Sequence, residues 1–97
     1  MYFIGIDCGT QSLRTGIFDE NGKPLAFATK DYPVYYPSSG WAEQDARDWW
    51  DALKFTVKKV LRDSGVDLKS IGGISLDATA CTVVPVDERG EPLRRAL

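Results

Sequence analysis

Apolar positions along the first third of the chain predict three strands. Residues 2–8 are almost all apolar, the pattern of a strand that is covered on both faces. Residues 12–19 alternate between apolar and polar side chains, and residues 24–31 do so again after Asn21-Gly22, a dipeptide typical of hairpin turns. Together these segments predict a three-stranded antiparallel meander.

A helix is predicted next, because apolar side chains recur at spacings of three and four over about 19 residues. Asp45 is a suitable N-cap, Asp48 stands in the capping-box position, and Gly65 supplies the C-terminal stop. The expected apolar stripe, which includes two of the three tryptophans, consists of Ala46, Trp49, Trp50, Leu53, Val57, Val60 and Leu61. With Trp41, these tryptophans are expected to serve packing.

Two further strands are predicted after the helix. Residues 71–76 form the first of them, and a right-handed crossover through the helix would place it parallel to residues 2–8. Residues 81–86 are expected at an edge of the sheet because they contain Pro85, and a sixth apolar segment begins at Pro92. The predicted order is β-β-β-α-β-β, which gives an α/β fold with a mixed sheet.

Composition excludes several classes of protein. The chain has 97 residues, of which 43% are hydrophobic and 27% charged, as in one ordinary folded domain. A net charge of -2 argues against nucleic-acid binding, and no apolar run reaches the roughly 18 residues of a membrane span. With two cysteines, no glycosylation sequon and no secretory leader, we expect a reduced, cytoplasmic protein. Because there is no histidine, residues 1–97 cannot supply a histidine for acid–base catalysis or metal binding.

The loop between the first two predicted strands offers groups suited to a phosphate. Its candidate anion-binding residues, which supply backbone and side-chain donors, are Gly9, Thr10, Gln11, Ser12 and Arg14. Asp7 would hold Mg²⁺ through a carboxylate oxygen or a bound water. A plain turn is an equally good interpretation, because Asp-x-Gly turns are common and no P-loop sequence is present.

A second polar stretch leaves the strand predicted over residues 71–76. If this strand is the parallel neighbour of the first, Asp77 and Asp7 lie at the same carboxyl edge, where ligands of open α/β sheets bind. The alternative is that Asp77 caps a turn and Thr79 bonds to local backbone. The residues alone leave both interpretations open.

Four blocks of sequence resemble the start of the FGGY carbohydrate kinases. They are GIDCGTQSLRTGIFD (residues 5–19), NGKP (21–24), GWAEQDARDWW (40–50) and IGGISLDATACTVVPVD (71–87), in the order found in that family. The stretch DATACTVVPVDERGEPL is most similar to ribulokinases, and GWAEQDARDWW is also similar to xylulokinases. The resemblance extends over nearly the whole chain.

This resemblance implies a ribonuclease H-like fold, as in actin, hexokinase and the Hsp70 ATPase. It implies ATP- and Mg²⁺-dependent phosphorylation of a sugar or polyol, most often a ketopentose such as ribulose or xylulose. Asp7 would fall on the magnesium-associated aspartate, and the phosphate loop would comprise Gly9, Thr10, Gln11, Ser12 and Arg14. The sugar-contacting stretch would hold Thr79 and Ala80, with Asp77 and Cys81 beside it.

Members of this family are several times longer than 97 residues. Their catalytic base, an aspartate, and their adenosine-binding loops lie far downstream. Residues 1–97 are therefore expected to be the N-terminal portion of the first kinase domain, a fragment without activity of its own. The full protein is expected to be a homodimer acting on a small molecule, and the fragment to self-associate through its unpaired sheet edge.

Two alternative functions belong to other classes. A two-metal nuclease on the same fold would use Asp7, Asp77 and a helix acid, either Asp48 or Asp51. A non-catalytic domain would bind a partner through the aromatic loop over residues 32–41.

Overall fold

Three antiparallel strands form where the alternation of apolar positions predicts them. The structure, a computed structural model, describes residues 1–97, and its first strands are β1 (Tyr2–Cys8), β2 (Ser12–Asp19) and β3 (Pro24–Asp31). The hairpin turn between β2 and β3 is closed by the Asp19 carboxylate, which accepts bonds from the backbone N–H groups of Asn21 and Lys23, both at 2.9 Å. The predicted meander is confirmed.

The helix α1 (Ala46–Ser64) also matches its prediction in length and in both ends. Asp45 accepts a bond from the Arg47 N–H at 2.9 Å, and Gly65 takes the left-handed conformation that ends the helix, with φ 69°. The predicted capping box is wrong, because the Oδ2 atom of Asp48 is buried without a partner. Burial, and then the carboxylates of Asp45 and Asp51, raise the pKa of Asp48.

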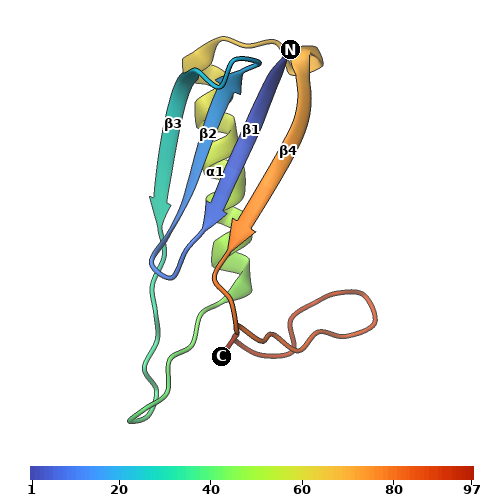
Figure 1. The fold of residues 1–97 in the computed structure, drawn as a ribbon. Coiled ribbons are helices and arrows are strands. Elements are labelled where there is room, and N and C mark those ends of the chain that lie inside the picture. The colour runs from blue at the N-terminus through green and yellow to red at the C-terminus, as the bar shows by residue number, and fades with distance from the viewer.

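After a short 3₁₀ turn, η1 (Leu68–Ser70), the chain enters β4 (Ile71–Ala78). The sheet order is β3-β2-β1-β4, with β4 parallel to β1 and the other neighbours antiparallel. Figure 1 shows β1 in the interior of the sheet and α1 behind it. The mixed sheet and the parallel crossover are confirmed.

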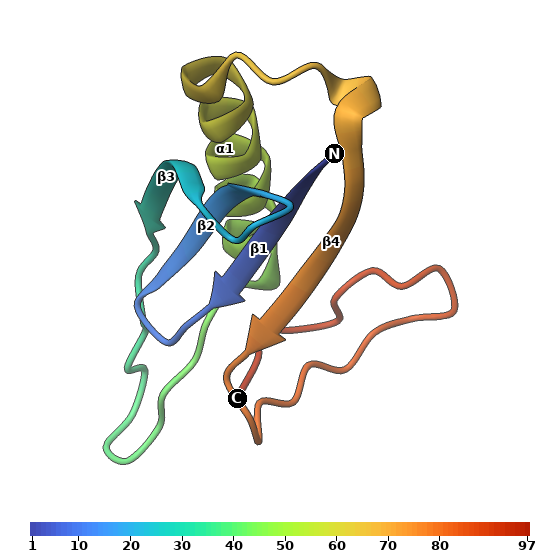
Figure 2. The same cartoon turned by 45° about the horizontal axis from the view of Figure 1, so that its top comes forward.

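The fifth predicted strand is wrong. Residues 79–97 leave the sheet as an extended loop beyond the end of β4, which both views show clearly (Figures 1 and 2). Cys81 has φ 63°, a left-handed conformation that turns the chain away from the line of β4, and Pro85 has no N–H for a ladder. Only isolated bridges occur in this stretch, such as Val86 with Pro92 and Gln44 with Ala96.

The hydrophobic core lies between α1 and one face of the sheet. Its buried members come from β1, β2, the end of β3 and α1: Ile4, Ile6, Leu13, Ile17, Ala28, Tyr32, Ala52 and Val60. The predicted helix stripe is confirmed for Val60 and for the half-buried Trp49, Leu53, Val57 and Leu61. It is wrong for Trp50, which is 60% exposed, while Ala52 and Thr56 take the inward positions.

The other surfaces of the sheet are open. The prediction that residues 2–8 are covered on both faces is wrong, because α1 covers only one of them and Phe3 on the other is exposed. α1 packs over β2 and β3 and leaves β4 uncovered, so Ile74 and Leu76 are 63% and 65% exposed. Trp41 is exposed as well and does not serve the core.

A pair of buried hydroxyl groups joins the sheet to the helix. Thr15 on β2 and Thr56 on α1 are 1% and 0% exposed, and their Oγ1 atoms are 2.8 Å apart. Thr56 donates its one hydroxyl proton to the Ala52 carbonyl at 2.9 Å. Thr15 must therefore be the donor to Thr56.

This direction of donation predicts unequal costs for two substitutions. Thr56→Val leaves the buried Thr15 hydroxyl without an acceptor and should lower the free energy of unfolding by about 1–3 kcal/mol. Thr15→Val leaves the Thr56 proton on the Ala52 carbonyl and should cost no more than about 1 kcal/mol. Urea unfolding of both variants measures the difference, and an equal or reversed order of costs would contradict the assignment.

Candidate functional site

The carboxyl ends of β1 and β4 bring two aspartates together. Asp7 and Asp77 are register partners in the parallel pair, so both occupy the sheet face turned away from α1. Arg14, the partner of Asp7 on β2, donates from Nη2 to Asp7 Oδ2 at 2.5 Å. The meeting of Asp7 and Asp77 at one edge, predicted from the crossover, is confirmed.

A hollow of about 410 Å³ lies against these three charged residues, on the same open face. Gly5 and Gly16 form part of its floor, where the lack of side chains leaves the space free. A Cβ atom at Gly16 would come within 2.7 Å of the Phe27 ring, so this close approach of ring and backbone requires glycine.

The loop from Gly9 to Ser12 is closed by its own backbone and by Tyr32. The Gly9 N–H donates to the Ser12 carbonyl at 2.9 Å, and the Tyr32 N–H donates to the Gln11 carbonyl at 3.1 Å. The Tyr32 hydroxyl reaches the carbonyls of both Gly9 and Ser12. Burial, followed by the neighbouring Cys8 thiol, raises the pKa of Tyr32, which keeps this hydroxyl protonated as a donor.

Two other segments hold the remaining carbonyls of the loop. Gln44, just before α1, donates from Nε2 to the Thr10 carbonyl, and Gln44 Oε1 accepts a bond from Trp49 Nε1 at 3.0 Å. The Thr79 N–H, just after β4, donates to the Cys8 carbonyl at 3.0 Å. Every carbonyl from Cys8 to Ser12 is therefore bonded within the protein.

The amides of this loop behave differently from its carbonyls. The N–H groups of Thr10 and Gln11 donate to no group of the protein, and both residues are exposed. The Arg14 guanidinium lies beside Gly9, the preceding residue of the loop, since a Cβ atom on Gly9 would be 3.1 Å from Arg14 Nη2. Outward N–H groups with a cation alongside form an arrangement suited to an anion such as phosphate.

The second predicted stretch, residues 77–81, is divided between two surfaces. Asp77 accepts a bond from the Ala78 N–H at 2.9 Å and faces the open hollow, whereas Thr79 lines a groove of about 400 Å³ on the α1 side. Ala80 and Cys81 are exposed and line neither hollow. Asp77 makes the local bond expected of a turn residue, alongside its edge position. The local bond expected for Thr79 is absent, because its N–H and its hydroxyl both bond to the Cys8 carbonyl on β1.

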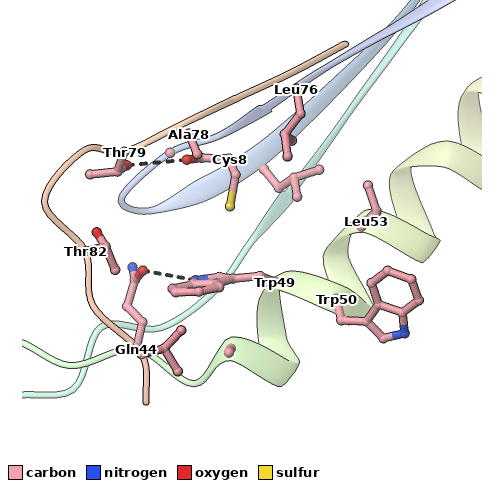
Figure 3. Close-up of a pocket in the computed structure, with 13 residues that line it drawn as sticks. Cys8, Gln44, Trp49, Trp50, Leu53, Leu76, Ala78, Thr79 and Thr82 are labelled. Carbon is pink, nitrogen blue, oxygen red and sulfur yellow. Dashed lines mark hydrogen bonds between the residues drawn. The ribbon is translucent and has the colours of Figure 1, made fainter. Parts of the chain in front are cut away.

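The groove runs between α1 and the uncovered side of β4. Its walls are mostly apolar and include Trp49, Leu53 and Leu76, while Gln44, Thr79 and Thr82 place polar atoms at one end (Figure 3). Tyr32 and Gln44, which the sequence alone did not indicate as site residues, lie at the end of the sheet where β1 and β4 finish. The hairpin register contained a signal for Tyr32, because Asp31 pairs with Ser12 and the next residue must then lie against the loop.

The acid set required for a two-metal nuclease does not form. No group of three or more His, Cys, Asp or Glu residues is arranged to hold a metal ion. Asp7 and Asp77 face away from α1, which carries Asp48 and Asp51 on the other side of the sheet. Asp48 stands in the first turn of α1, where the helix dipole favours a carboxylate, and Asp51 pairs with Lys54 at 3.3 Å.

The aromatic loop before α1 is partly absorbed into the structure. Tyr32 is buried, and the Arg95 guanidinium lies 3.7 Å from the centre of the Tyr35 ring. Arg94 and Arg95 both pair with the buried Glu43 carboxylate, which holds the end of the chain against this loop. No helix of the structure has the length and apolar character needed to cross a bilayer.

Residues 2–97 match the N-terminal domain of the FGGY family of carbohydrate kinases. The chain is 35% identical to the glycerol kinase of Enterococcus casseliflavus over 97 residues, which cover 99% of this chain and 19% of that protein. It is 39% identical to the ribulokinase of Halalkalibacterium halodurans over 104 residues, covering 95% of this chain and 18% of that protein.

Among solved structures, the xylulose kinase of Rhodospirillum rubrum superposes with a TM-score of 0.92 and 29% identity, covering 99% of this chain and 20% of that one. The chain belongs to the FGGY family of carbohydrate kinases and has the actin- and hexokinase-like ATPase fold of its structural neighbours. It spans about a fifth of the length of the curated relatives it matches.

The loop geometry predicts an uneven pattern of amide hydrogen exchange. The N–H groups of Thr10 and Gln11 should exchange with solvent at nearly the rate of an unstructured chain, because they make no internal bond. The N–H groups of Gly9 and Tyr32 should be protected. Exchange followed by NMR checks both expectations, and protected amides at Thr10 and Gln11 would contradict the outward orientation.

Proposed function

We propose that this chain is the opening part of the first domain of a longer kinase that transfers phosphate from ATP to a sugar or polyol. The observation that carries the proposal is the loop from Gly9 to Ser12, with its carbonyls bonded inward, two N–H groups free of any internal bond, and the Arg14 guanidinium beside Gly9. Membership of a carbohydrate kinase family, and the small share of its relatives' length that the chain spans, support the same conclusion.

In this proposal the loop binds the terminal phosphates of the nucleotide. The N–H groups of Thr10 and Gln11 donate to phosphate oxygens, and the hydroxyl groups of Thr10 and Ser12 add further donors. Arg14 adds a guanidinium, which can donate two parallel bonds to one phosphate. Gly9 leaves room for Arg14 to approach, since any side chain there would press on the guanidinium.

Asp7 at the sheet edge is proposed to hold Mg²⁺, with the Asp77 carboxylate beside it. Carboxylate oxygens are the ligands that Mg²⁺ prefers. Asp7 and Asp77 are register partners on adjacent strands, and neighbouring strands of a sheet lie about 5 Å apart. Each keeps one carboxylate oxygen that is not engaged by Arg14 or by the Ala78 N–H. When bound, Mg²⁺ would offset the negative charge of the phosphates.

The acceptor is proposed to be a ketopentose, with ribulose first and xylulose second. The similarity to a ribulokinase at 39% identity and to a xylulose kinase structure supports this choice. The glycerol kinase at 35% identity makes a polyol the alternative class of acceptor. Thr79 and Ala80, with Asp77 and Cys81 beside them, are proposed to contribute to the sugar side of the site.

The assembly proposed for the full protein is a homodimer. The outer edges of β3 and β4 have no partner strand, and Ile74 and Leu76 are exposed on β4. For the 97-residue chain alone, such edges favour self-association.

The test is a screen of sugars and polyols with ATP on the full-length protein, with Asp7→Ala and Asp51→Ala as paired variants. Loss of Asp7 should lower kcat/KM at least about a hundredfold, because it removes a charge that organises the phosphates. The fold should persist, since the exposed Asp7–Arg14 pair contributes only about 0.2–1 kcal/mol.

Asp51 is the matched control because it is an exposed carboxylate on α1 whose ion pair is with Lys54. Its replacement should leave the rate within about twofold of the unchanged protein. An unchanged kcat/KM in Asp7→Ala would contradict the proposed role of Asp7. Phosphorylation by the 97-residue chain alone would contradict the proposal that it is one part of a longer enzyme.

A further inference from the structure

We propose that Tyr32 and Gln44 are positioning residues for the nucleotide phosphates, because they bond the carbonyls of the Gly9–Ser12 loop inward and so turn the N–H groups of Thr10 and Gln11 outward. The inference rests on the proposed function of that loop. Tyr32 follows β3 and Gln44 precedes α1, so the two residues hold the loop from segments distant in sequence.

The hydroxyl of Tyr32 has a role that is separate from core packing. The side chain is 7% exposed, and its ring belongs to the core, which a phenylalanine would fill equally well. The hydroxyl, however, lies among the carbonyls of Gly9 and Ser12 and the Cys8 thiol. Its one proton is shared between the two carbonyls, so the thiol is the donor in the contact with Cys8.

Gln44 is suited to its place by having both an acceptor and a donor. Its Oε1 accepts from Trp49 Nε1 at 3.0 Å, which leaves Nε2 directed to the Thr10 carbonyl, and Figure 3 shows Gln44 beside the Trp49 ring. A glutamate in this position would accept from Trp49 equally well but would face the Thr10 carbonyl with an oxygen. Trp49 is a residue of α1 and is half-buried against the core, so its position sets the direction of the Gln44 side-chain amide.

The orientation of the loop decides whether it attracts or repels an anion. A peptide unit that turns over presents its carbonyl oxygen, and not its N–H, to the phosphate. The bonds from Tyr32 and Gln44 oppose such a turn in a segment that contains Gly9 and makes only one bond within itself, from Gly9 N–H to the Ser12 carbonyl. Donors already in place bind a phosphate without reorganisation of the loop.

The experiment compares Tyr32→Phe with Tyr36→Phe in the full-length kinase. Tyr36 is 73% exposed and its hydroxyl makes no hydrogen bond, so it is the matched control. Tyr32→Phe should raise the KM for ATP about fivefold to tenfold, the effect of one lost hydrogen bond, and leave the KM for the sugar within twofold. Gln44→Glu should raise the KM for ATP in the same way, and Tyr36→Phe should change neither constant.

A purely structural role for Tyr32 would give a different result. The KM values for ATP and sugar would then rise together with a fall in Tm, and this outcome overturns the inference. An unchanged KM for ATP in both Tyr32→Phe and Gln44→Glu also overturns it.

A binding measurement separates this inference from the proposed function. If the unchanged protein phosphorylates no sugar or polyol, the proposed function fails, and calorimetric titration with inorganic tripolyphosphate then tests the loop directly. Weaker binding by Tyr32→Phe than by Tyr36→Phe supports the positioning role without any catalysis. Equal binding by both variants, or no binding by the unchanged protein, overturns it.

Discussion

The carbonyl groups of residues 8–12 all need hydrogen-bond donors inside the protein, and the rest of the structure is arranged to supply them. Donors come from four places: the loop itself, Tyr32 after β3, Gln44 before α1 and Thr79 after β4. The parallel pairing of β4 with β1 brings Thr79 to the Cys8 carbonyl. An inward set of carbonyls leaves N–H groups outward, so packing the fold also forms the surface that we propose binds phosphate.

The proposed phosphate site would account for the similarity of this chain to kinases that act on different acceptors. The loop from Gly9 to Ser12 and the Asp7–Asp77 edge offer charge and N–H donors but little shape that would distinguish one sugar from another. Glycerol kinase and ribulokinase are matched at 35% and 39% identity. A phosphate site of the proposed kind, which does not depend on the acceptor, is consistent with this similarity.

Features that depend on local pattern were predictable, and features that depend on distant contacts were not. The alternation in β2, the Asn21-Gly22 turn and the Asp45 and Gly65 ends of α1 fixed those elements, and the crossover rule placed Asp7 beside Asp77. The strand expected over residues 81–86 failed, since the backbone turns at Cys81. The contacts of Tyr32 and Gln44 with the loop depend on tertiary packing, which periodicity does not encode.

A crystal structure of the full-length protein with a non-hydrolysable ATP analogue and Mg²⁺ would show directly whether the Gly9–Ser12 loop binds the phosphates. We expect terminal phosphate oxygens within hydrogen-bond distance, about 2.7–3.2 Å, of the backbone nitrogen of Thr10 or Gln11. The carbonyls of Gly9 and Thr10 should still be bonded to Tyr32 and Gln44. Phosphates bound away from this loop, or a loop with its carbonyls turned toward the nucleotide, would contradict the proposal.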